Sequence, residues 1–154
     1  MIIENLIVMG RACPEPLANG RITVCLAGWA EEWGFVRLYP TRPDLKWSRW
    51  SIINVEVEKP PNDSRLESWK IVGSRSEWDA LQSRIEIIGT VTDAGFKRSL
   101  IAGLVDEGIH VLNRDQRSLG IVNPTILKTY FAPNAGYDEL WQMGLPGLTD
   151  LDTY

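Results

Sequence analysis

RITVCLA at residues 21–27 and GFVRLY at residues 34–39 are the two stretches that decide the fold. Apolar side chains alternate with others in both. In the second stretch Val36 and Leu38 share one face, and aromatic and basic side chains share the other. A period of two is typical of a β-strand with one buried face. The acidic pair at residues 31–32 predicts a turn, so we expect two neighbouring strands.

Further strands are predicted on both sides of this pair. Residues 2–9 are apolar apart from two positions, residues 51–58 are rich in β-branched side chains, and residues 67–72 are a shorter candidate. Glycine and proline interrupt the chain in residues 10–20 and again at residues 60–61. Turn signals about every 8–12 residues are typical of a small β-barrel or β-sandwich.

The second half of the chain changes from strand to helix patterns. Residues 76–79 (SEWD) resemble a capping box, and apolar side chains follow at helical spacing. A second helix is predicted to begin after Asp93 and to stop at Gly108. Strand patterns return at residues 118–122 and 127–131. The predicted class is therefore mainly β with one or two helices (α+β).

Length and composition indicate one ordinary domain, or two very small ones sharing a core. Of the 154 residues 44% are hydrophobic and 23% charged, as in globular proteins. Seven residues are Trp, and we expect most of these rings to fill the core. The net charge of −4 lies at the end of the chain, because residues 138–154 hold four acids and no Lys or Arg. Residues 1–137 are formally neutral, so nucleic acid stays a possible ligand of the main domain.

Residue types that carry catalysis are sparse. The single histidine, His110, is expected to be a packed strand residue, and Cys25 is expected to be a buried, inert thiol. Neither a glycine-rich phosphate loop nor a Gly-x-Ser-x-Gly motif is present. We therefore predict a protein that is not an enzyme, with no metal site and no cofactor. The two cysteines, the lack of a basic leader and the lack of an apolar run of about 20 residues favour the cytoplasm and no membrane contact.

Three blocks, read in order, carry a resemblance to a known family. They are Gly20 to Gly28 (GRITVCLAG) with Trp33 and Val36 to Pro40 (VRLYP); Ile52 to Glu58 with Pro60-Pro61 and Glu67 to Ile71 (ESWKI); and Ser118 to Pro124 (SLGIVNP). Over about residues 1–132 the chain resembles the dual OB-containing domain family of bacterial and phage proteins.

This resemblance implies an OB-like small barrel, or two compact OB units sharing a core. It divides the chain into a first OB-like unit at residues 1–73 and helices plus a second, incomplete OB-like unit at residues 74–136. An acidic C-terminal tail follows at residues 137–154. OB-like barrels often accept single-stranded nucleic acid on a concave β-face, and this is what the resemblance implies about function.

Basic and aromatic side chains are interspersed in one region, which is the candidate nucleic-acid-binding site. Its residues are Arg37, Tyr39, Arg42, Lys46, Trp47, Arg49 and Trp50, with Asp44 as the opposing charge. Guanidinium groups bind phosphates, and flat rings stack on bases. The alternative interpretation is a loop that packs its Trp rings on the barrel and leaves its charges in water.

The acidic tail is a second candidate surface. Trp141, Met143 and Leu145 are the candidate partner-binding residues, because apolar side chains set among acids can dock on a partner. The tail can also fold back on a basic groove in place of a nucleic-acid strand. A third interpretation is a final strand or turn that covers the barrel.

Two hypotheses of function follow from these features. The first is a non-catalytic module that binds single-stranded DNA or RNA, as an accessory subunit of a bacterial or phage nucleic-acid-processing or defence system. The second is a protein–protein adaptor, or a phage-type inhibitor, that docks on a larger complex. The expected partner is accordingly a nucleic-acid strand, a larger protein complex, or both.

Overall fold

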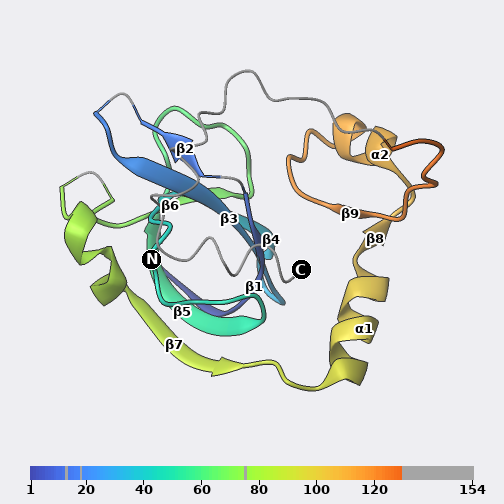
Figure 1. The fold of residues 1–154 in the computed structure, drawn as a ribbon, viewed down its shortest axis with the longest axis horizontal. Helices are drawn as coiled ribbons and strands as arrows, with labels where there is room; N and C mark the ends of the chain where they lie inside the picture. The colour runs from blue at the N-terminus through green and yellow to red at the C-terminus, as the bar shows by residue number, and fades with distance from the viewer. Residues whose placement is uncertain (13, 18, 75, 130–154) are drawn as a thin grey trace. The chain divides into compact units, whose positions relative to one another are not determined.

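The computed structural model describes residues 1–12, 14–17, 19–74 and 76–129. Its strands are β1 (Ile2–Arg11), β2 (Glu15–Pro16), β3 (Ile22–Ala30), β4 (Gly34–Thr41), β5 (Ser51–Glu58), β6 (Ser68–Ile71), β7 (Ile85–Thr90), β8 (Val105–Asp106) and β9 (Ile121–Val122). Its helices are the 3₁₀-helix η1 (Trp78–Arg84), α1 (Ala94–Gly103) and α2 (Ile109–Arg114) (Figure 1). The chain divides into two units, Met1–Asn123 and Pro124–Tyr154.

Five of the strands close into a barrel. β1 pairs antiparallel with β3 and β3 with β4, β4 pairs in parallel with β6, β6 pairs antiparallel with β5, and β5 returns to β1. Numbered as they follow in the chain, the barrel strands are arranged 1-2-3-5-4-1, with the parallel pair between the third and the fifth. A five-stranded Greek-key barrel is the architecture of the OB-fold. The predicted class, mainly β with an OB-like barrel and a few helices, is confirmed.

The alternation that predicted the strands sorts their side chains between core and surface. In β4, Val36 and Leu38 are fully buried, whereas Arg37 and Tyr39 lie half-buried on the outer face. β5 repeats the pattern, with burial at every second position of its first seven. The inward side chains of these strands belong to one apolar cluster, which is the core of the barrel. Burying apolar surface in this way is the main stabilising contribution to the fold.

The connection between β4 and β5, residues 42–50, also contributes to the core. Leu45 and Trp47 are buried, with 6% and 4% of their surface exposed, and both belong to the apolar cluster of the barrel. The Arg11 guanidinium of β1 donates hydrogen bonds to the carbonyls of Pro43 and Trp47, both at 3.1 Å. Trp47 therefore packs on the barrel, as the alternative interpretation of this region expects.

After β6 the chain departs from the predicted pattern. The helix expected to start at the SEWD motif is the 3₁₀-helix η1, and no side-chain hydrogen bond caps its first turn, so the capping-box prediction is wrong. Trp78 and Leu81 of η1 are buried in the core. The strand β7 was not predicted, because its sequence IEIIGT lacks a clean alternation. It pairs with β5, and in the described part of the chain no strand pairs with its other edge.

The helices beyond β7 match the predictions in part. α1 begins after Asp93 as predicted, and the Asp93 carboxylate caps it by accepting a hydrogen bond from the Phe96 amide. The helix ends at Gly103, earlier than the predicted Gly108. His110 is exposed on α2 and is not a packed strand residue, so that prediction is wrong.

The strands predicted near the end of the chain are short or absent. The predicted strand at residues 118–122 is reduced to β9, which pairs in parallel with β8. Residues 127–129 form no strand, and residues 130 and 131 of that predicted strand lie outside the described residues. Of the helices in the described ranges, none is long and apolar enough to cross a membrane.

Candidate ligand-binding groove

The outer faces of β3 and β4 form the surface on which OB-folds bind their ligands. Phe35, Arg37 and Tyr39 lie at alternate positions along β4, all half-buried. On β3, Ala27 is paired with Arg37 and Trp29 with Phe35, and these positions are half-buried as well. This face therefore combines aromatic rings with a guanidinium group at positions that a ligand can reach.

Two cavities lie along this face and share a wall. The smaller, of about 430 Å³, is lined by Tyr39 and by part of the loop between β5 and β6. The larger, of about 810 Å³, is lined by Phe35 at its β4 side. Ser64 and Arg65 line both cavities. We call the combined depression the β4 groove, and the loop of residues 59–67 beside it the groove loop.

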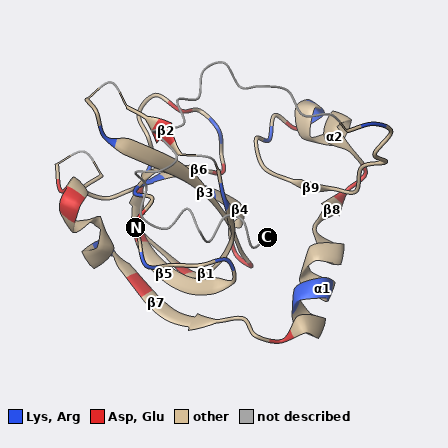
Figure 2. Cartoon of the chain, in the orientation of Figure 1, with Lys and Arg blue, Asp and Glu red and all other residues tan. Residues whose placement is uncertain are grey.

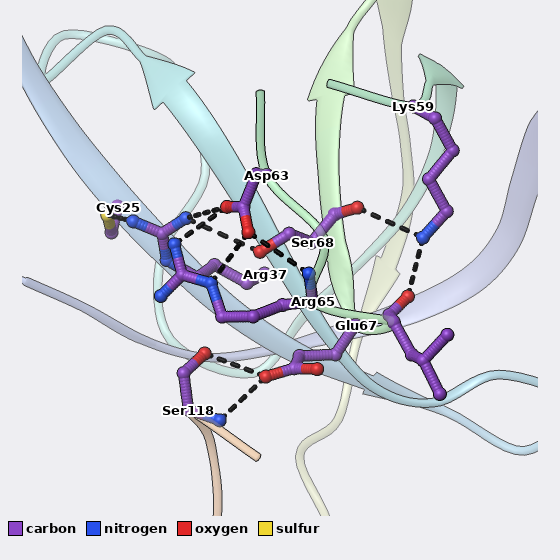
Figure 3. A network of polar contacts seen from close by, with 9 residues as sticks. Cys25, Arg37, Lys59, Asp63, Arg65, Glu67, Ser68 and Ser118 are labelled. Carbon is purple, nitrogen blue, oxygen red and sulfur yellow. Dashed lines mark hydrogen bonds and ion pairs between the residues drawn. The ribbon is translucent and has the colours of Figure 1, made fainter. Parts of the chain in front are cut away.

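Asp63 of the groove loop lies between two arginines (Figure 3). Its carboxylate accepts two hydrogen bonds from the Arg65 side chain, at 2.8 and 2.7 Å, and one from Arg37 at 3.3 Å. The Arg65 amide donates a fourth, at 3.2 Å. The Arg37 guanidinium also contacts the Cys25 sulfur at 3.0 Å and lies 4.9 Å from the centre of the Tyr39 ring. One carboxylate thus orients two cations at the wall of the groove.

Lys59 ties the groove loop to β6. Its Nζ donates to the carbonyls of Leu66 at 2.6 Å and Ser68 at 3.2 Å (Figure 3). The same Nζ lies 3.7 Å from the centre of the Trp69 ring. The Trp69 ring packs edge-on against Trp33, with the ring centres 5.2 Å apart. The loop therefore rests on an aromatic pair that belongs to the barrel.

The segment after α2 forms part of the wall of the larger cavity. Ser118 donates hydrogen bonds from its amide and its hydroxyl to one oxygen of the Glu67 carboxylate, each at 2.7 Å. Its neighbours Arg117 and Leu119 line the cavity. This pair of hydrogen bonds, which Figure 3 shows, connects the segment to the groove loop.

The ionisable groups of this region respond to these contacts. Hydrogen bonds from Arg65 hold the pKa of Asp63 well below its usual range, against an opposing effect of burial. Burial acts to raise the pKa of Glu67, but the hydrogen bonds from Ser118, a hydrogen bond from the Glu67 backbone and the charge of Arg65 together outweigh it, so this pKa is lowered too. Burial lowers the pKa of Lys59 and raises the pKa of the Cys25 thiol.

The structure brings only some of the predicted site residues together. Arg37 and Tyr39 lie in the β4 groove, side by side on the outer face. Trp47 is buried, so its ring cannot stack on a base, and the prediction that Trp47 belongs to the binding site is wrong. Arg42 is bound to the carboxylates of Asp44 and Asp79.

Three further predicted residues lie on the connection between β4 and β5. Lys46 is exposed, and its amide donates to the side chain of Gln82. Arg49 and Lys97 both approach the half-buried Trp50 ring, at 5.7 and 5.2 Å from its centre. None of these residues lines either cavity of the groove. The predicted site is thus two separate groups, of which one lies in the groove.

Sequence reasoning missed the residues that the groove loop supplies. Asp63 and Arg65 follow the Pro60-Pro61 interruption, and neither of them was assigned a role from the sequence. The signal that could have located them is topological, because the loop between the fourth and fifth barrel strands flanks the binding face of an OB-fold. Lys70 on β6, which also lines the smaller cavity, was missed for the same reason.

Charge is distributed differently on the surface as a whole and in the groove. Figure 2 shows basic and acidic segments interspersed over the barrel strands. The smaller cavity differs, because Arg37, Arg65 and Lys70 line it against one acid, Asp63. Lys70 is paired with Glu58 at 2.9 Å, so three bases are offset by two acids and one net positive charge remains at the smaller cavity. This charge suits the smaller cavity to an anionic group.

The candidate partner-binding residues Trp141, Met143 and Leu145 lie outside the described residues. Among the residues that the structure describes, no group of three or more His, Cys, Asp and Glu side chains is placed to hold a metal ion.

Fold and groove define a class: a small OB-like β-barrel protein with a ligand-sized groove on its third strand. Residues 3–99, more than half of the chain, match the family described as Domain of unknown function (DUF8758), and the chain belongs to that family. No curated protein and no solved structure matches this chain. The resemblance to the dual OB-containing domain family stays a prediction.

Proposed function

We propose that this protein is a non-catalytic module that binds single-stranded nucleic acid in the β4 groove. One observation carries the proposal: Phe35 and Tyr39 lie on either side of Arg37 along one strand of the OB-type binding face, over two adjoining cavities. Rings on one face of a strand are suited to stacking on bases, and the cation between them is suited to a phosphate.

The charge of the smaller cavity favours a polyanion over a neutral ligand. OB-folds also bind oligosaccharides, which are recognised without a concentration of positive charge. With Glu58 counted against its partner Lys70, three bases stand against two acids, and the remaining positive charge favours the phosphate backbone instead. The proposed role is that of an accessory subunit in a bacterial or phage nucleic-acid-processing or defence system.

The test is binding of labelled dT and rU 12-mers, measured by fluorescence anisotropy at several salt concentrations. The double variant Phe35→Ala, Tyr39→Ala is expected to weaken binding by about 30-fold or more, since each stacked base contributes about 1–3 kcal/mol and two are lost. The matched control is Trp50→Ala, which removes an aromatic ring outside the groove and is expected to change the affinity less than about two-fold. Wild-type protein that binds neither oligonucleotide at 20 mM salt would overturn the proposal.

A protein partner is the second candidate function, and strand β7 favours it. Ile87 and Ile88 of β7 are 41% and 45% exposed, on a strand whose outer edge is unpaired among the described residues. An exposed strand edge can accept a strand from another protein. An adaptor with this surface should retain a protein partner in a pull-down, lose it in the variant Ile88→Lys, and ignore oligonucleotides.

A further inference from the structure

We infer that the Asp63 carboxylate occupies the place of a backbone phosphate in the β4 groove, and that a bound nucleic-acid strand displaces it from Arg65. This inference rests on the proposed function and specifies how the site takes its ligand. The ligand class is a phosphodiester.

The hydrogen-bond donors around Asp63 are those that a phosphate would take. Its carboxylate accepts hydrogen bonds from two guanidinium groups and one backbone amide, four in all. Guanidinium groups bind carboxylate and phosphate with the same bidentate geometry. Arg65 presents that geometry to Asp63, through its Nε and one terminal nitrogen.

The two arginines differ in how firmly they are held. Arg37 has 16% of its side chain exposed and also contacts the Cys25 sulfur, the Ser68 hydroxyl and the Tyr39 ring. Arg65 has 39% exposed and donates its side-chain hydrogen bonds to Asp63. Arg65 also lines both cavities. It is therefore the arginine that can turn from Asp63 to a phosphate, while Arg37 stays fixed.

Replacement of the Asp63 carboxylate by a phosphate at Arg65, which we call the exchange, affects the affinity of the protein for nucleic acid. In the free protein Asp63 neutralises one of the two guanidinium charges, and the ligand must replace an existing pair. If Asp63 loses its charge, the groove gains one unit of positive charge and Arg65 is released without competition. Removing this acid is then expected to strengthen binding, whereas removing an acid that merely holds the groove loop in shape would weaken it.

The chain offers a matched control. Arg42 and Asp44 form the same kind of pair, two residues apart and bidentate, with Nε to Oδ1 at 2.8 Å as in the Arg65–Asp63 pair. Asp44 lines neither cavity of the β4 groove. Asp63→Asn and Asp44→Asn therefore make the same change in net charge, one inside the groove and one outside it.

The experiment measures binding of a labelled dT 12-mer to the full chain and the two variants between 20 and 300 mM salt. Asp63→Asn is expected to bind about 3- to 10-fold more tightly at 50 mM salt, because the same phosphate contacts form without loss of the Asp63–Arg65 pair. Asp44→Asn is expected to change the affinity less than about two-fold.

A second measurement follows Arg65 directly. The NMR signal of the Arg65 Nε–H, assigned by its loss in Arg65→Lys, is expected to move when the wild-type protein is saturated with the dT 12-mer, and that of Arg42 is not. Equal effects of the two Asn variants, weaker binding by Asp63→Asn, or an unmoved Arg65 signal would overturn the exchange.

Failure of the inference differs from failure of the proposed function. If the wild type binds and binding depends on Phe35 and Tyr39, but Asp63→Asn binds no more tightly, the groove binds nucleic acid without the exchange. If neither the wild type nor Asp63→Asn binds at 20 mM salt, the proposed function is wrong and the exchange falls with it.

Discussion

Asp63 links the stability of the groove loop to its own ionisation. Its carboxylate accepts four hydrogen bonds from Arg37 and Arg65, and hydrogen bonds to an ionised group are stronger than those between neutral groups. The pKa of Asp63 is lowered, mainly by Arg65. A lowered pKa in the folded state means that the ionised carboxylate stabilises the fold, and this stabilisation depends on pH.

We predict that Asp63→Asn lowers the free energy of unfolding by about 1–2 kcal/mol at pH 7. The stabilisation by Asp63 is fully present above the pKa of an unfolded Asp, about 3.9, and is lost as the pH falls towards the lowered pKa of the folded state. The difference between variant and wild type should therefore shrink by about 1 kcal/mol from pH 5 to pH 3. Urea unfolding at pH 7, 5 and 3 measures it, and a difference that does not change with pH contradicts the prediction.

Trp47 and Trp50 show how neighbouring residues of one type differ in role. Trp47 lies in the core with 4% of its surface exposed, and its indole Nε1 has no hydrogen-bond acceptor among the described residues. Trp50 is half-buried beside Arg49 and Lys97. A buried donor without a partner is unfavourable, so the Trp47 ring stabilises the fold through its apolar volume and not through its N–H group.

We predict that Trp47→Ala lowers the free energy of unfolding by about 3–5 kcal/mol, because it leaves a cavity in the core. Trp47→Phe should cost clearly less, since it keeps a ring and removes the unpaired donor. Thermal unfolding compares the two variants. Oligonucleotide affinity of Trp47→Phe should equal that of the wild type. A large loss of affinity in this folded variant would show that Trp47 takes part in binding.

Close packing of β1 against β3 depends on one glycine. A Cβ atom at Gly28 would lie 2.7 Å from the Leu6 Cδ1 and 3.0 Å from the Ile7 carbonyl oxygen. The Leu6 side chain is fully buried, and the Ile7 oxygen belongs to the backbone, so neither neighbour can move freely. The barrel therefore closes at this point only with a residue that has no side chain.

We predict that Gly28→Ala lowers the free energy of unfolding by about 1–3 kcal/mol through overpacking. Gly10→Ala is the control, because a Cβ there meets no atom within 4 Å, and its effect should stay within about 0.5 kcal/mol. Guanidinium chloride unfolding of both variants checks this. Equal destabilisation by the two substitutions would show that loss of glycine as such, and not the contact with Leu6, is the cause.

For the molecule as a whole, the sequence predicted those features that depend on residues close together in the chain. The alternation of residues 21–27 and 34–39 depends on neighbours in the chain, and it predicted β3 and β4. The predicted buried side holds in β4, whereas in β3 the polar Thr23 is buried as well. The parallel pairing of β4 with β6 joins Arg37 to Ser68, far apart in sequence, and no local pattern encodes it. Because this pairing places the groove loop beside β4, the pair of Arg37 with Asp63 could not be predicted either.

The net negative charge of the chain is expected to weaken binding of a polyanion. Residues 138–154 carry four acids and no base, so removing them changes the formal net charge from −4 to zero. A polyanion is repelled by net negative charge over distances of about a Debye length, roughly 10 Å at 0.1 M salt. We predict that a chain ending at residue 137 binds the dT 12-mer about 2- to 10-fold more tightly at 20 mM salt, with the gain vanishing at 300 mM.

The full-length variant in which Asp138, Glu139, Asp150 and Asp152 are replaced by Asn or Gln separates charge from length. If repulsion is the cause, this variant should bind as tightly as the shortened chain at every salt concentration. A gain that appears only on deletion, or that persists at 300 mM salt, would instead indicate that the tail covers the β4 groove through contacts other than charge, since screening removes electrostatic effects but not apolar ones.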